Sequence, residues 1–188
     1  SDTPQALLGE YKFFEGIKGG KLLYNSIIDD AGSASKLTIE NFKVIKAPAF
    51  ATLLTLADLG GFADLLSGQG MSFDILEINF QDDINTTTIE EILALGSSVS
   101  LQMDGYIEKK SGLVSLRGTL VPAKMLNSLV SKIPVVGKIL VGDKVGEGVF
   151  GVSFKTKGLP GDIKTTVNPV KTITPRFITR ALENMKKN

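Results

Sequence analysis

Hydrophobic and polar residues alternate along much of this chain, and the alternation predicts strands joined by short polar turns. In the segment 99–107, Val99, Leu101 and Met103 occupy one face, and polar residues occupy the positions between them. The same reasoning predicts strands at residues 22–28, 37–45, 73–80, 86–95, 99–107, 113–121, 150–155 and 163–167. Alternation of this kind with short turns is typical of an antiparallel meander that has one buried face.

Other segments place apolar residues at helical spacing, often after a proline in the first turn. They predict helices at residues 2–14, 48–59, 62–66, 122–141 and 174–185, the first ending before Gly19-Gly20. The 188 residues are enough for one domain with a real core, so we treat 1–188 as a single unit. The predicted fold is α+β: a curved antiparallel meander with short apolar helices packed on one side or end.

The apolar stripes of residues 48–66 and 122–141 have two interpretations. They either cover the hydrophobic face of the meander, or they line a groove that admits an acyl chain. Shielding such a chain from water is worth about 0.8 kcal/mol per CH₂ group. The terminal helix, with Arg176, Arg180, Lys186 and Lys187, likewise either packs on the sheet or lies on a membrane surface.

Composition excludes several classes of chemistry. The chain has no His and no Cys, which removes the commonest proton shuttle, the commonest metal ligand, thiolate nucleophiles and most structural zinc sites. The acidic pairs Asp29-Asp30 and Asp82-Asp83 fall in predicted turns, and Glu90-Glu91 should point to opposite faces of a strand. A net charge of +1 and the absence of Trp argue against a nucleic-acid partner. We therefore expect no enzyme activity, no catalytic residues, no metal and no cofactor.

The N-terminus and the longest apolar runs indicate whether this sequence contains a membrane anchor or a signal peptide. No run reaches the roughly 20 apolar residues that span a bilayer. The chain begins with Ser1 and has no signal-peptide pattern, so we expect a piece of a longer protein that carries any anchor elsewhere.

Short motifs at particular spacings lie along nearly the whole chain. The most specific is LRGTLVP at residues 116–122. The others lie at residues 19–22, 47–48, 53–57, 60, 65–68, 70–73, 126–128, 133–137, 146–148, 167–169 and 174–175. In these motifs the chain resembles the C-terminal region of the AsmA-like envelope proteins of Gram-negative bacteria, the group of AsmA, TamB and YhdP. That family usually has Tyr in the region of Phe154 and a small apolar residue near Leu159; both departures are minor.

The resemblance implies a non-enzymatic terminal module of an envelope protein that transports phospholipid between the inner and outer membranes or maintains the outer membrane. The module would lie in the periplasm, in a full-length protein anchored in the inner membrane. Its partners would be phospholipid or a membrane surface; the alternative is a docking or capping module for an envelope protein, without lipid of its own. The predicted lipid or membrane contacts are apolar residues of the second helical segment: Met125, Leu126, Leu129, Val135, Val136, Ile139 and Leu140.

Overall fold

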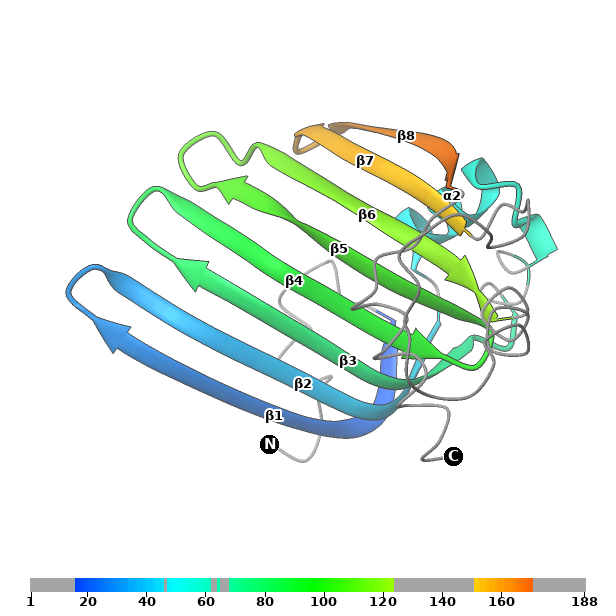
Figure 1. Ribbon diagram of the computed structural model, residues 1–188, viewed down its shortest axis with the longest axis horizontal. Coiled ribbons are helices and arrows are strands. Elements are labelled where there is room, and N and C mark those ends of the chain that lie inside the picture. Colours follow the sequence, from blue (N-terminus) through cyan, green and yellow to red (C-terminus); the bar gives the residue numbers. More distant parts are fainter. Residues whose placement is uncertain (1–15, 46, 62–63, 65–67, 124–150, 171–188) are drawn as a thin grey trace, which may run out of the picture.

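The computed structural model describes residues 16–45, 47–61, 64, 68–123 and 151–170. In this part of the chain, eight strands form one antiparallel sheet in which each strand pairs with the next along the sequence (Figure 1). The strands are β1 (Ile17–Asp29), β2 (Gly32–Val44), β3 (Met71–Asp82), β4 (Thr86–Gly96), β5 (Val99–Glu108), β6 (Val114–Pro122), β7 (Gly151–Leu159) and β8 (Asp162–Val170). β1 and β8 are the two edges, so the sheet is not closed.

All eight predicted strands are confirmed, and most are longer than predicted. The helical content is smaller than predicted: among the described residues, α2 (Pro48–Leu56) is a helix, and Gly60, Gly61 and Asp64 are also helical. The described part is therefore nearly all-β rather than clearly α+β. The helices predicted at 2–14, 62–66, 122–141 and 174–185 lie wholly or almost wholly outside the described residues.

The glycine pair at the start of β1 corrects one predicted boundary. Gly19-Gly20 was expected to end a helix, but both residues lie inside β1. Gly20 has φ 90°, and Asn41 opposite has φ 53°, where the pairing of β1 with β2 skips one residue on each strand. A Cβ atom on Gly20 would lie 2.9 Å from the Cβ atom of Phe42, so the glycine here allows a close approach of two strands.

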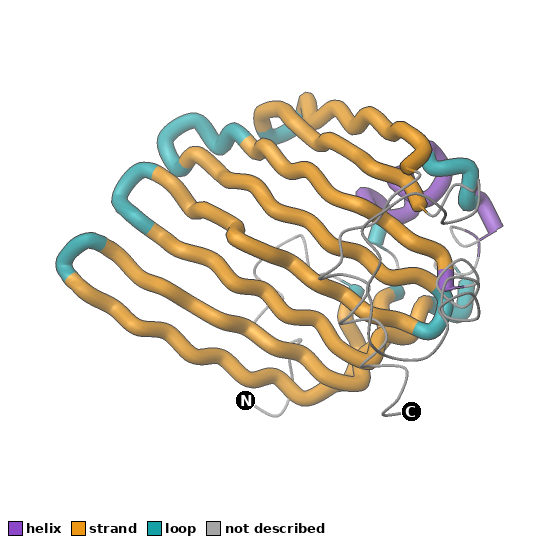
Figure 2. The backbone as a smooth tube through the Cα atoms, viewed as in Figure 1, coloured by secondary structure: helices purple, strands orange, loops and turns teal. Residues whose placement is uncertain are grey.

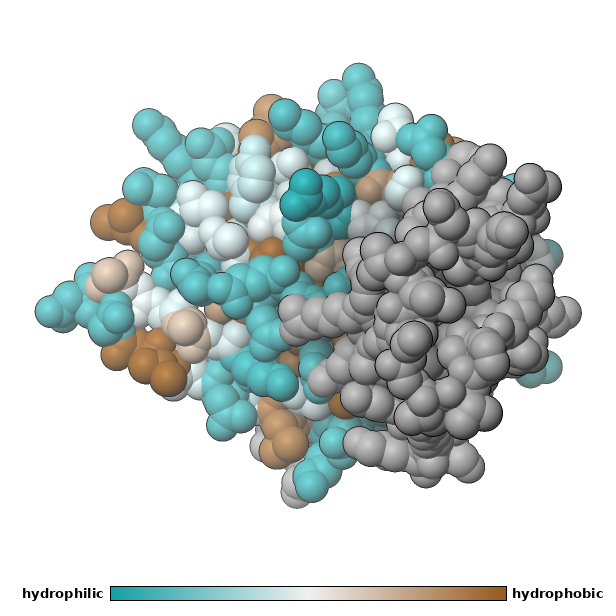
Figure 3. All heavy atoms as spheres, viewed as in Figure 1, coloured by the Kyte–Doolittle hydropathy of each residue, from teal (hydrophilic) through white to brown (hydrophobic). Residues whose placement is uncertain are grey.

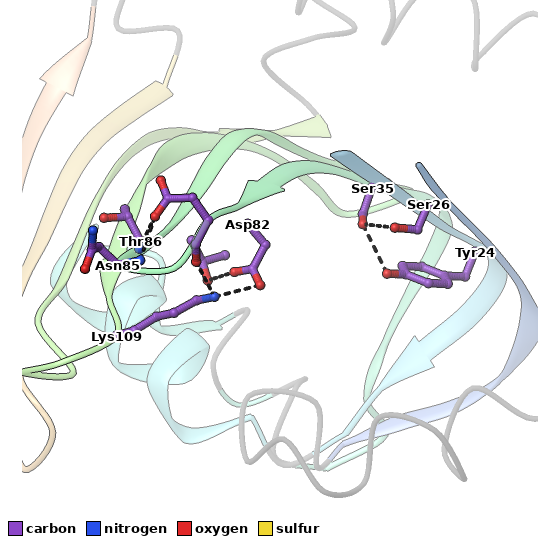
Figure 4. A network of polar contacts seen from close by, with 9 residues as sticks. Tyr24, Ser26, Ser35, Asp82, Asn85, Thr86 and Lys109 are labelled. Carbon is purple, nitrogen blue, oxygen red and sulfur yellow. Dashed lines mark hydrogen bonds and ion pairs between the residues drawn. The ribbon is translucent and has the colours of Figure 1, made fainter. Parts of the chain in front are cut away.

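The sheet is curved like an arch, and α2 lies on its concave side (Figures 1 and 4). Leu53 and Leu54 of α2 are buried in the same apolar cluster as sheet residues such as Ile39 and Leu120. At this end the rings of Phe42 and Phe73 stack with centroids 5.4 Å apart, and Phe50 of α2 packs on Phe73 at 6.3 Å. Aromatic contacts of this kind add to the stabilisation from burial, so they fix α2 on the sheet.

The hairpin turns β1–β2, β3–β4, β5–β6 and β7–β8 all lie at the same end of the strands, the end that is far from α2 (Figure 2). A meander has this arrangement because every second connection returns to the same end. Each turn is short, and Asp29 and Asp83 accept hydrogen bonds from backbone N–H groups in their own turns, at 2.7–3.0 Å. The two ends of the sheet therefore differ: one is covered by a helix and the other consists of turns.

Candidate functional site

The concave face of the sheet is the candidate site, and the strand register shows how its side chains are ordered. Residues directly opposite one another on neighbouring strands share a face, so the register traces rows that run across the sheet. Beyond the Phe42–Phe73 pair at the α2 end, the first row consists of Leu22, Ile39, Leu76, Ala94, Leu101, Leu120 and Val152. The second row consists of Tyr24, Leu37, Ile78, Ile92, Met103, Gly118, Phe154 and Val167. Apart from the Tyr24 hydroxyl, both rows are apolar.

Towards the hairpin turns the same face becomes more polar. The third row consists of Ser26, Ser35, Phe80, Ile89, Gly105, Leu116, Thr156 and Thr165. The fourth consists of Ile28, Ser33, Asp82, Thr87, Ile107, Val114, Gly158 and Ile163. The concave face is therefore graded along the strands, from wholly apolar beside α2 to mixed beside the turns.

Hydroxyl groups gather where the concave face meets β1 and β2. The Ser35 hydroxyl lies 2.9 Å from the Ser26 hydroxyl and 3.1 Å from the Tyr24 hydroxyl, and all three lie under the arch (Figure 4). A matching pair, Thr156 and Thr165, joins β7 and β8 at 3.0 Å. These groups accept and donate hydrogen bonds without carrying charge, so they suit a polar but uncharged or zwitterionic ligand.

An ion pair lies beside the β3–β4 turn, between the hydroxyl cluster of β1 and β2 and the Thr156–Thr165 pair of β7 and β8. The Lys109 ammonium donates to Asp82 Oδ2 at 2.8 Å and to the Asp83 carbonyl oxygen at 2.5 Å. The Thr87 hydroxyl donates to Asp82 Oδ1 at 2.5 Å. The hydrogen bonds from Lys109 and Thr87 hold the pKa of the Asp82 carboxyl below its ordinary value of 3.8.

This lowered pKa gives a pH-dependent prediction. The unfolded chain binds a proton on Asp82 more readily than the folded chain, so the ion pair stabilises the fold above about pH 4 and loses that effect as the pH falls through the lower, folded pKa. Asp82→Asn should reduce the free energy of unfolding at pH 7 by under about 1 kcal/mol, because both partners are partly exposed. Urea unfolding should show that the difference in the free energy of unfolding between Asp82→Asn and the parent chain is smaller near pH 3 than at pH 7. Asp162→Asn is the control, since Asp162 is 79% exposed and 3.9 Å from Lys164; a difference for Asp82→Asn that persists at pH 3 would contradict the assignment.

On the outer, convex face, the orientation of Glu90 and Glu91 differs from the prediction made from the sequence. Glu90 and Glu91 were expected to point to opposite faces, but β4 has an irregularity between Ile89 and Ile92 that inserts an extra residue. Both glutamates therefore lie on the outer face, where Gln81 donates to Glu90 at 2.6 Å and Gln102 donates to Glu91 at 2.8 Å. Each carboxylate is held by its own amide, which is a structural arrangement and not that of a catalytic acid and base.

The outer face also has an open depression of about 820 Å³ over β4 to β7. Side chains of both charge signs and a tyrosine line it, among them Glu90, Asp104, Tyr106, Arg117, Lys155 and Lys157. Figure 3 shows that the described part of the face in view is mostly hydrophilic, with hydrophobic atoms towards the hairpin turns and the edges. In this part of the chain no group of acidic residues is arranged to hold a metal ion.

The predicted contact residues Met125, Leu126, Leu129, Val135, Val136, Ile139 and Leu140 lie outside the described residues. The concave rows were missed as a site because their order depends on cross-strand register, which alternation within one strand does not reveal. Among the described helical residues, no segment is both long and apolar enough to cross a membrane.

Comparisons of this chain with protein-family models, with curated proteins and with solved structures find no match.

Proposed function

We propose that the chain binds an amphiphilic lipid, of the phospholipid class, on the concave face of its sheet. On this proposal it is a non-enzymatic, periplasmic module of a bacterial envelope protein, anchored in the inner membrane, that moves phospholipid between the inner and outer membranes. The resemblance of its motifs to those of AsmA-like proteins favours this role. The observation that carries it is the graded concave face, apolar beside α2 and hydroxyl-bearing beside the turns.

The gradient matches the two parts of a phospholipid. Acyl chains would lie against the partly buried apolar side chains of the second and third rows, where each buried CH₂ group contributes about 0.8 kcal/mol. Phe80, Ile92 and Met103 are only partly buried, so the middle of this face has apolar surface available for contact. The headgroup would lie near the Tyr24, Ser26 and Ser35 hydroxyls. The predicted helix over residues 122–141, part of the proposed α+β fold, would add apolar contacts to the lipid.

Native mass spectrometry of the purified chain, followed by organic extraction, tests the proposal. We expect a phospholipid in stoichiometric amount, and uptake of a fluorescent phospholipid by the delipidated chain. A chain that is purified without lipid and takes up no phospholipid would contradict the proposal. Binding of a detergent-solubilised envelope protein by such a lipid-free chain would favour the docking alternative.

A charge in the second row should remove lipid binding. Met103→Glu would place a carboxylate among apolar side chains, where it is costly to bury against an acyl chain, so uptake should fall by more than about ten-fold. Thr88→Glu is the matched control, because Thr88 is exposed on the outer face of the neighbouring strand. Far-UV circular dichroism checks that both variants fold; equal uptake by folded Met103→Glu and Thr88→Glu would contradict the assigned face.

A further inference from the structure

A cationic surface lies on the outer face of β6, β7 and β8. Arg117 is directly opposite Lys155, and Lys157 is directly opposite Lys164. Like charges directly opposite one another destabilise an antiparallel pair of strands. Two such pairs on adjoining strands therefore have a cost in the free chain that an anionic partner would relieve.

The acidic residues nearby compensate only part of this charge. Arg117 donates to Asp104 at 2.9 Å, and Lys164 lies 3.9 Å from the highly exposed Asp162. Lys155 and Lys157 are exposed, and no salt bridge joins either of them to an acidic residue in the described part of the chain. The surface therefore keeps a local positive charge, although the net charge of the whole chain is only +1.

An exposed leucine borders the cationic surface. Leu159 follows Lys155 and Lys157 at two-residue intervals on β7, so it lies on the same face, beside the β7–β8 turn, and it is 50% exposed. Tyr106, 40% exposed, lies across β6 from Lys157, since both pair with Ser115. Cations next to an exposed leucine and a tyrosine form a surface with the chemistry of a membrane interface.

We propose that this cationic surface, formed by Arg117, Lys155, Lys157 and Lys164 with Leu159 at its border, docks onto an anionic phospholipid bilayer. Lysines near a bilayer are attracted to anionic headgroups, and the leucine is buried among acyl chains. A nucleic acid would satisfy the lysines but offers no hydrocarbon for Leu159. The surface lies on the opposite face from the proposed lipid site, so either proposal can fail while the other holds.

The β1–β2 and β3–β4 turns, at the same end of the sheet, also expose apolar side chains, but acidic residues accompany them. Ile27 and Ile28 are 78% and 79% exposed, and Ile84 is 88% exposed. Their turns contain Asp29-Asp30 and Asp83, which an anionic bilayer would repel. Charge therefore assigns the docking surface to β6, β7 and β8.

Co-sedimentation of the 188-residue chain with vesicles tests the docking surface. The parent chain should bind phosphatidylcholine vesicles that contain about 30% phosphatidylglycerol, bind vesicles of phosphatidylcholine alone far less, and lose affinity as salt is added. The double variant Lys155→Glu/Lys157→Glu should weaken binding by about thirty-fold or more. Leu159→Ser should reduce the binding that persists at high salt.

A matched control separates this surface from net charge. Lys18→Glu/Lys21→Glu changes the net charge by the same amount on β1, the opposite edge of the sheet, and should keep binding near that of the parent chain. All these side chains are exposed, so circular dichroism should show folded variants. Equal loss in both double variants, or no binding by the parent chain, overturns the proposal. Full competition by heparin, with no effect of Leu159→Ser, also overturns it and identifies a soluble polyanion as the partner.

Discussion

Replacing Phe154 with alanine is expected to lower the free energy of unfolding by about 3–5 kcal/mol. Phe154 is 5% exposed and lies in the second row of the concave face, between Gly118 and Val167. A Cβ atom on Gly118 would lie 2.6 Å from Phe154 Cζ, so the ring covers the space that the glycine leaves. Removing the ring therefore leaves a cavity beside a residue that has no side chain to fill it.

Equilibrium unfolding in urea, followed by far-UV circular dichroism, measures this loss as a lower midpoint. Leu159→Ala on the same strand is the control: its side chain is half exposed, and its effect should stay within about 0.5 kcal/mol. A loss below about 1 kcal/mol for Phe154→Ala would mean that the ring does not pack in the core. Such a result would contradict the packing of Gly118, Phe154 and Val167 into one apolar row across β6 to β8.

The strands could be predicted because each has a period-2 pattern that one buried face imposes. Val99, Leu101 and Met103 show why: an antiparallel strand with one covered face needs an apolar residue at every second position. The turn aspartates were also recognisable, since Asp29 and Asp83 have the local hydrogen-bonding chemistry that turns favour. These features depend only on neighbours along the chain.

The graded concave face and the cationic surface could not be predicted in the same way. Both depend on which residues of different strands lie opposite one another, and an irregularity such as the one at Glu90 shifts that register without an obvious change in the hydrophobic pattern. Arg117 and Lys155 are far apart in sequence, yet they are direct neighbours in the sheet. Within one strand, each lysine looks like an ordinary solvated residue.

Gly105→Ala gives the second large effect, and its sign is opposite to that of an ordinary glycine-to-alanine change. Alanine in place of glycine within a strand ordinarily stabilises a protein by about 0.4–1 kcal/mol, because the unfolded chain loses freedom. Gly105, however, has φ 151°, and a Cβ atom there would lie 2.1 Å from the Ser115 carbonyl oxygen and 2.9 Å from Leu116 Cα. β5 and β6 must separate locally to admit it, so we expect a loss of about 3 kcal/mol in the free energy of unfolding.

Gly60→Ala is the matched control for this substitution. Among the described residues, a Cβ atom on Gly60 would meet no atom within 4 Å, and its backbone is outside the positive-φ region, so the same chemical change should be neutral or stabilising by about 0.4–1 kcal/mol. Urea unfolding of the two variants side by side measures the contrast. If Gly105→Ala proved as stable as Gly60→Ala, β5 and β6 could not approach each other as closely at Gly105 as the register requires. The third row, in which Gly105 lies between Ile89 and Leu116, would then be displaced, and with it the polar end of the proposed lipid site.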